Sequence, residues 1–291
     1  MKPVTNLIRQ KGVLVSDGAW GTILQQKGLQ AGECPELWNI EHADDVVAIA
    51  KSYIDAGSDL IETNSFGGSV FKLEHYGLAD RAHEINEAAA GLSRQAAGEK
   101  LVIASMGPTG KILMMGEITE EQLYEAFKTQ AVALAEGGAD ALCIETMSAI
   151  DEAVCAIKAA KENTRLEIIC TFTFEKTVDN TYRTMMGVSP AEMAQAVLDA
   201  GADILGSNCG NGIANMVEIT RELHQAAPDT PILIHANAGM PEHVDGEVVF
   251  PETPEMMAHQ TPMLREAGAS IIGGCCGTTP GHIRAIRSVL E

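Results

Sequence analysis

A short apolar run, rich in β-branched residues, recurs eight times along the 291 residues and constrains the fold more than any other feature. Each run is apolar at nearly every position rather than at alternate positions, which is typical of strands buried on both faces of a parallel sheet. Parallel strands need long connections, which helices usually supply. The runs span residues 13–15, 59–61, 101–103, 141–144, 167–170, 203–205, 232–234 and 270–272.

Helical patterns separate these runs, and the clearest cover residues 44–56, 120–136, 190–200 and 254–267. Three of them close on an acidic residue, an alanine and a glycine, with Gly57, Gly201 and Gly268 placed to adopt the left-handed helix cap. Eight strand and helix units in a chain of this length predict an α/β fold, a single-domain (β/α)8 barrel over residues 1–291. A doubly wound open sheet is the rival, but no Gly-x-Gly-x-x-Gly follows the first run.

The charge and the cysteine content narrow the classes of function. A formal net charge of −20 argues against nucleic acid and against an anionic membrane surface as partners. No apolar stretch long enough for a signal peptide or a membrane-spanning helix is apparent. We therefore expect a cytoplasmic protein whose seven cysteines are reduced, either buried and inert or serving as metal ligands.

Polar and glycine-rich segments follow most of the predicted strands, at the end where barrels of this kind place their active sites. Three cysteines fall there: Cys209 after the sixth run, and Cys275 and Cys276 after the eighth. Cys143, Cys155 and Cys170 fall within predicted strands or a helix, where we expect inert packing. Cys34 falls in a predicted loop, where an exposed thiol is expected.

Three thiolates at one end of a barrel suit zinc and leave a fourth coordination position open, as in catalytic sites. Adjacent side chains on a regular strand point to opposite faces, so Cys275 and Cys276 can share an ion only where the strand breaks. Gly273, Gly274 and Gly277 permit such a break. Such an ion favours binding and deprotonation of a substrate thiol over hydrolysis. The alternatives are two ordinary small residues or a vicinal disulfide.

These motifs resemble the homocysteine methyltransferase family over about residues 12–290. The segments 206–210 and 273–277 carry the resemblance, supported by segments 17–22, 62–66 and 237–241. Within the family, the tail 277–283 is most similar to the homocysteine-binding module of cobalamin-dependent methionine synthase. The resemblance implies a zinc-dependent (β/α)8 barrel that methylates homocysteine to methionine.

The resemblance also implies roles for individual residues. Cys209, Cys275 and Cys276 would bind zinc and carry the catalysis, and Asn237 matches a position close to the metal. Asp17 and Glu145 match carboxylates that receive the substrate's amino group, and the backbone amides of Ser105 and Gly107 and of the 237–239 turn are candidate carboxylate acceptors. The residues expected to bind substrate are Asp17, Asn64, Ser105, Glu145 and Asn237.

Two residues depart from the family pattern and border the expected pocket. Trp20 stands where a residue such as Met is usual, and it could stack on a methyl donor or simply pack. His235 stands where Pro is frequent, and it could act as a general base or be a satisfied residue at a strand end. Both leave the identity of the methyl acceptor open.

The donor and the partners are open as well. The sequence contains one barrel, so we expect a small-molecule thiol substrate and a methyl donor that is free or arrives on a separate protein, as methylcobalamin on a corrinoid protein or on separate cobalamin or folate modules. An alternative is a corrinoid-system methyltransferase acting on another thiol, thioether or methoxy compound. A non-catalytic zinc-dependent barrel and a metal-free enzyme working through His235 and Glu145 are further alternatives.

Overall fold

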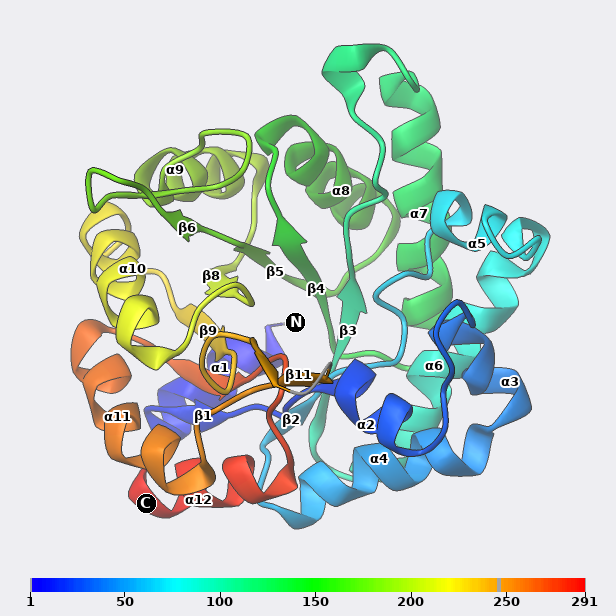
Figure 1. The fold of residues 1–291 in the computed structure, drawn as a ribbon. Coiled ribbons are helices and arrows are strands. Elements are labelled where there is room, and N and C mark those ends of the chain that lie inside the picture. The colour runs from blue at the N-terminus through cyan, green and yellow to red at the C-terminus, as the bar shows by residue number, and fades with distance from the viewer. Residues whose placement is uncertain (1, 245–246, 291) are drawn as a thin grey trace.

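The computed structural model describes residues 2–244 and 247–290 and contains one parallel sheet of eight strands in the order β1-β12-β9-β8-β5-β4-β3-β2. The sheet curls into a nearly closed barrel with the helices arranged around it (Figure 1), which confirms the predicted (β/α)8 fold. Each of the eight predicted runs contributes a strand. The strands are β1 (Leu14–Val15), β2 (Leu60–Ile61), β3 (Leu101–Met106), β4 (Ala141–Met147), β5 (Glu167–Phe172), β8 (Ile204–Asn208), β9 (Ile232–Ala236) and β12 (Ile271–Gly274).

The helices agree closely with the sequence pattern. The helices predicted over residues 120–136, 190–200 and 254–267 have those bounds, and the one predicted over 44–56 spans Ala43–Asp55. Gly57, Gly201 and Gly268 adopt φ angles of +106°, +101° and +113°, as the predicted helix ends require. The helices are α1 (Pro3–Lys11), α2 (Trp20–Gln26), α3 (Trp38–Glu41), α4 (Ala43–Asp55), α5 (Val70–Glu74), α6 (Ala82–Ala97), α7 (Glu120–Glu136), α8 (Ile150–Asn163), α9 (Pro190–Ala200), α10 (Ile213–Ala226), α11 (Pro254–Ala267) and α12 (Pro280–Leu290).

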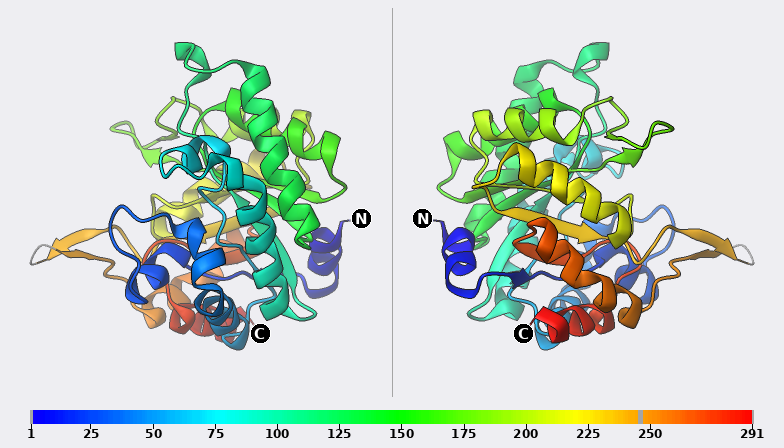
Figure 2. Two further views of the ribbon diagram at one scale, coloured as in Figure 1. Left: turned by 90° about the vertical axis from the view of Figure 1, so that its right-hand side faces the viewer. Right: turned by 90° about the vertical axis from the view of Figure 1, so that its left-hand side faces the viewer.

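Two antiparallel hairpins add to the barrel: β6 (Glu175–Lys176) with β7 (Tyr182–Arg183), and β10 (Glu242–Val244) with β11 (Glu247–Val249). Figure 2 shows the β10–β11 hairpin projecting from one end of the barrel, while α1 lies at the opposite end. No helix in the described part of the chain has both the length and the apolar character needed to cross a bilayer.

The core has two layers. One lies between the sheet and the outer helices, and the other fills the barrel with one buried apolar side chain or more from each strand. Helix α1 covers the amino-terminal end of this inner layer through Val4. The Glu167 carboxylate at the start of β5 accepts hydrogen bonds from the backbone N–H groups of Val4 (2.8 Å) and Thr5 (3.1 Å) and so caps α1. The inner-layer residues are Val4, Leu14, Leu60, Ile103, Ala141, Cys143, Ile169, Ile204, Leu233 and Ile271.

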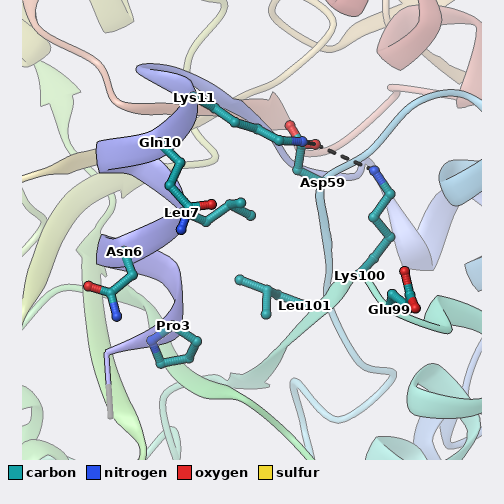
Figure 3. A pocket seen from close by; sticks show the side chains of 9 residues that line it. All are labelled: Pro3, Asn6, Leu7, Gln10, Lys11, Asp59, Glu99, Lys100 and Leu101. Carbon is teal, nitrogen blue, oxygen red and sulfur yellow. Dashed lines mark hydrogen bonds and ion pairs between the residues drawn. The ribbon is translucent and has the colours of Figure 1, made fainter.

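The barrel closes between β1 and β2 around Asp59. Its backbone N–H donates to the carbonyl of Val15 at 2.7 Å, and its buried carboxylate accepts the N–H of Val15 at 3.1 Å. Lys11, Lys100 and Arg287 approach the same carboxylate at 2.6, 3.5 and 2.7 Å. Figure 3 shows Lys11 and Lys100 converging on Asp59 beside a cavity of about 350 Å³ at the α1 end. Side chains from three separate segments therefore reinforce the closure.

Candidate active site

The predicted cysteine group forms at the carboxyl end of the barrel. The Sγ atoms of Cys209 and Cys276 are 3.7 Å apart, those of Cys275 and Cys276 are 4.0 Å apart, and all three lie within 4.8 Å of one another. All three thiols are free, and 4.0 Å is far too long for a vicinal disulfide. The three side chains could therefore hold one metal ion.

Local backbone breaks bring the three thiols together. Strand β12 ends at Gly274, so Cys275 and Cys276 lie in the turn that follows it rather than on a regular strand. A Cβ atom at Gly274 would lie 2.3 Å from Oγ1 of Thr278, so only glycine fits where the strand ends. Cys209 follows β8 with a φ angle of +61°, a conformation that a side chain other than glycine seldom adopts. Strain of this kind is common at functional sites.

The donor set fits a tetrahedral ion of the zinc type. Zn–S bonds of about 2.3 Å in a tetrahedron place two sulfurs about 3.8 Å apart, and the two shorter separations here are 3.7 and 4.0 Å. Hydrogen bonds from the thiols of Cys275 and Cys276 lower the pKa of Cys209 to about 3, and these contacts raise the pKa of Cys276 to about 11 and that of Cys275 well above its ordinary value. A divalent cation bound here would stabilise all three as thiolates.

The thiols open onto a cavity of about 340 Å³ that is lined by residues at the carboxyl ends of β3, β4, β8, β9 and β12 and by the segments that follow β1, β2, β8 and β12. Its wall contains Trp20 and Phe66 as the large apolar surfaces. The residues that line it include three glutamates and three cysteines but no lysine or arginine. The cavity therefore suits a small ligand with a cationic group and a sulfur atom.

Glu145 is one of the predicted substrate-binding residues that line the cavity. It lies near the end of β4 and lines the cavity, with its carboxylate held by the hydroxyl of Ser105 and by Nδ2 of Asn208 at 3.0 Å. Burial raises the pKa of Glu145 to about 7. Thr146 follows with a φ angle of +60°, and its backbone N–H donates to Oδ1 of Asn208 at 2.9 Å. Ser105 and Asn208 therefore orient the carboxylate, and no Lys or Arg among the described residues forms a salt bridge with it.

The carboxylate of Asp17 is held by groups of the protein itself. Its carboxylate is fully buried and accepts hydrogen bonds from the indole N–H of Trp20 at 2.9 Å and from the backbone N–H of Glu62 at 2.8 Å. Trp20 lines the cavity, whereas Asp17 is not among the lining residues. Burial raises the pKa of Asp17 to about 6. Trp20 therefore lines the cavity and also donates to Asp17, and the Asp17 carboxylate links the segments that follow β1 and β2.

The remaining predicted contacts serve mainly to hold the loops. Nδ2 of Asn64 donates to the carbonyl of Pro35 at 2.7 Å, although Asn64 also lines the cavity. The backbone amides of Ser105 and Gly107 donate to Oγ1 of Thr63 and to the carbonyl of Phe66, both at 3.0 Å.

Asn237 lies beside the thiol group. A hydrogen bond from its side chain contributes to the low pKa of Cys209. Its backbone N–H donates to the carbonyl of Asn211 at 2.8 Å, and its buried Oδ1 has no hydrogen-bond partner in the described part of the chain. The place of Asn237 near a metal remains a prediction.

Glu62, which directly follows β2, was not among the residues predicted to bind substrate. It lies in the cavity wall with its Oε1 3.7 Å from Nδ1 of His235. Burial, the charge of Glu145 and the charge of Asp17 raise its pKa well above the ordinary value. Burial lowers the pKa of His235 to about 4, so its imidazole is neutral. Two sequence signals could have indicated Glu62: its place directly after a predicted strand and its position in the segment 62–66 that supports the family resemblance.

The other cysteines lie outside this group. Cys143 and Cys170 are buried in strands and Cys155 in α8, as predicted. Cys34 was expected to be exposed, and this was wrong, because only 5% of its surface is accessible where its loop packs against Leu73 and Ile85. Burial raises the pKa of Cys34 to about 11.

Together, these features define the class of the protein as a (β/α)8 barrel with a three-thiol group, suited to a soft metal ion, in the wall of an anionic cavity. The profile of the family described as homocysteine S-methyltransferase matches residues 14–290. The chain therefore belongs to this family of S-methyltransferases.

Known proteins resemble the chain over nearly all its length. It is 31% identical to the methionine synthases of Mycobacterium tuberculosis (strain ATCC 25618 / H37Rv) and Mycobacterium leprae (strain TN), over 96% of this chain and 24% of each relative. The chain thus spans about a quarter of the length of these curated relatives. The metallated form of the homocysteine methyltransferase MmuM from Escherichia coli has the same fold, with a TM-score of 0.82 at 23% identity over 99% of both chains. The oxidised form of the same enzyme gives a TM-score of 0.81 at 23% identity over 99% of both chains.

Proposed function

We propose that the chain is a zinc-dependent methyltransferase that activates the thiol of L-homocysteine for attack on a methyl donor, giving methionine. The observation that carries the proposal is the three-thiol group within 4.8 Å at the wall of an anionic cavity. Family membership and the names of the relatives support homocysteine as acceptor. The metallated form of the Escherichia coli enzyme supports a metal in this fold.

Cys209, Cys275 and Cys276 would hold the ion. When bound, zinc would supply a Lewis acid with an open coordination position, where a thiol has a lowered pKa. The protein's own residues place the rest of the substrate. Glu145, oriented by Ser105 and Asn208, offers its carboxylate to the substrate's ammonium group.

The donor we propose is a methyl-corrinoid supplied on a separate protein or module. A corrinoid is much larger than a cavity of about 340 Å³, so its methyl group would have to approach from the mouth of the barrel. Trp20 in the cavity wall and the half-exposed Phe66 leave that side apolar, which suits a methyl group in transit. Folate-derived or sulfonium donors are outcomes of the test below.

The test begins with metal analysis and continues with calorimetric titration of L-homocysteine. We expect about one zinc per chain, and proton release on binding, measured in buffers of different ionisation enthalpy. The Cys209→Ser variant should lose both its zinc and its binding of L-homocysteine. Cys155→Ser is the matched control, because Cys155 is a buried thiol in α8 outside the site.

Turnover assays with methylcobalamin separate the remaining functions. Methionine formation supports the proposal. Methyl transfer to another thiol, a thioether or a methoxy compound, with no methionine formed, would favour the corrinoid-system alternative. Zinc binding without transfer to any thiol would favour a non-catalytic barrel. Unchanged activity in Cys209→Ser would favour a metal-free enzyme that works through His235 and Glu145.

A further inference from the structure

Two buried polar atoms in the cavity wall have no hydrogen-bond partner among residues 2–244 and 247–290: Oε1 of Glu62 and Nε2 of His235. The side chain of Glu62 is 10% exposed and that of His235 is 2% exposed. Buried polar groups in native proteins are nearly always paired, so an unpaired one calls for an explanation. Two such atoms in one cavity wall indicate a ligand group that pairs with both.

The two side chains come from different parts of the barrel and lie close together. Glu62 follows β2, His235 belongs to β9, and Oε1 of Glu62 lies 3.7 Å from Nδ1 of His235. This separation is too long for a hydrogen bond, so the pair does not satisfy itself. The imidazole packs against Gly273, where a Cβ atom would lie 2.8 Å from Cδ2 of His235.

The charge around the pair indicates the sign of the ligand group. Glu36, Glu62 and Glu145 line the cavity with the three cysteines, and no lysine or arginine is among the lining residues. The Asp17 carboxylate is already bonded to Trp20 and to the backbone of Glu62. A second anion beside Glu62 would be repelled, whereas a cation would be attracted to the carboxylate.

We propose that Glu62 and His235 together bind the α-ammonium group of the substrate thiol and so select amino-acid thiols over simple thiols. This inference rests on the proposed function and adds a specificity determinant to it. An ammonium group has three N–H donors. One donates to Oε1 of Glu62, one to Nε2 of His235, and one to Glu145, whose charge acts on Glu62 across the cavity. Nδ1 of His235 then carries its proton on the side that faces Glu62.

The test compares L-homocysteine with 4-mercaptobutanoate, which lacks only the amino group, by calorimetric titration of the zinc-loaded protein. The wild-type protein should bind L-homocysteine at least about tenfold more tightly, the range expected for hydrogen bonds to a charged group. Glu62→Gln and His235→Leu should each weaken homocysteine binding about tenfold or more and change the affinity for 4-mercaptobutanoate less than about twofold. Zinc content is measured for every variant and should equal that of the wild type.

The matched control is Glu252→Gln. Glu252 also has a buried carboxylate oxygen without a partner among the described residues, but it does not line the cavity, so both affinities should stay at the wild-type level. His235→Gln, which keeps an acceptor on the side chain, should recover part of the selectivity lost in His235→Leu.

The outcomes separate this inference from the proposed function. Equal wild-type affinity for the two thiols would overturn the inference whatever the variants do, and so would an equal loss for both thiols in Glu62→Gln. In either case homocysteine still binds and the proposed function stands. Failure of the zinc-loaded wild-type protein to bind any thiol would overturn both.

Discussion

Replacing Asp59 with asparagine tests how the barrel closes between β1 and β2. The Asp59 side chain is fully buried, and its ion pairs with Lys11 at 2.6 Å and Arg287 at 2.7 Å are the shortest. Removing one partner of a buried ion pair costs about 3–5 kcal/mol. The side chains of Lys11 and Lys100 are 43% and 40% exposed, so water can solvate both after the change. We therefore expect the lower end, about 3 kcal/mol, mostly from Arg287, which is 21% exposed.

The assay is urea unfolding followed by far-ultraviolet circular dichroism. The control is Asp55→Asn, which breaks an exposed pair with Lys51, 58% and 62% exposed respectively, and should cost less than about 0.5 kcal/mol. Zinc content should not change in Asp59→Asn, since the thiols lie at the other end of the barrel. If Asp59→Asn unfolds within about 0.5 kcal/mol of the wild type, the hydrogen bond between the Asp59 N–H and the Val15 carbonyl is enough to close the barrel, and the reasoning is refuted.

The ion pairs of Asp59 also predict how the stability of the protein depends on pH. Burial disfavours the charged carboxylate of Asp59, but the hydrogen bond from Lys11 and the charge of Arg287 outweigh it and hold the pKa below 3.8. For an acid with a lowered folded-state pKa, the stabilisation is complete above the unfolded pKa and is lost as pH falls through the folded value. The stability difference between wild type and Asp59→Asn should therefore be constant down to about pH 4 and shrink below it. A difference that shrinks toward alkaline pH instead would contradict this assignment.

Three further predictions concern the site. Asn208→Leu removes the donor 3.0 Å from Glu145, so the pKa of Glu145 should rise above about 7 and the pH profile of homocysteine binding should move to higher pH; an unchanged profile would exclude this role. Gly274→Ala places a Cβ atom 2.3 Å from a threonine oxygen and should lower zinc content, whereas Gly91→Ala, with its nearest contact at 3.9 Å, should keep it. Chelation of zinc should lower the melting temperature of the wild type and should not change that of Cys209→Ser. If free zinc was at a hundredfold its Kd, the stabilisation that is lost is about 2.7 kcal/mol. Equal shifts in both proteins would mean that the chelator acts elsewhere.

The barrel could be predicted from the sequence because its signals are local. Helices α7 and α9 have Thr119 and Ser189 as their N-cap residues, and each forms a capping box with the residue three positions later. Helices α9 and α11 are followed by the C-cap residues Gly201 and Gly268, which take the left-handed conformation. Each boundary depends on residues within one turn, so the pattern alone locates it.

The sequence contains no such local signal for the two hairpins or for the position of α1. Strand β6 is two exposed residues, Glu175–Lys176, and therefore has no buried face to create an alternating pattern. Helix α1 has an amphipathic sequence, but its position under the barrel depends on Glu167, which lies more than 160 residues away and caps it. Contacts across such distances do not appear in a local pattern.

The site also contains residues that the sequence pattern could locate and residues that it could not. The cysteines were predictable because the end of a strand determines the end of the barrel at which a residue lies, and Gly274 allows the chain to turn there. Asp17 and Glu62 are indistinguishable by that rule, since each is an acidic residue close after a predicted strand. The two carboxylates differ in their partners. The indole N–H of Trp20, whose ring lines the cavity, donates to the Asp17 carboxylate. Oε1 of Glu62, in contrast, has no hydrogen-bond partner among the described residues. The carboxylate that remains available for a ligand is therefore the one that the fold has not already paired, and only the three-dimensional contacts distinguish the two.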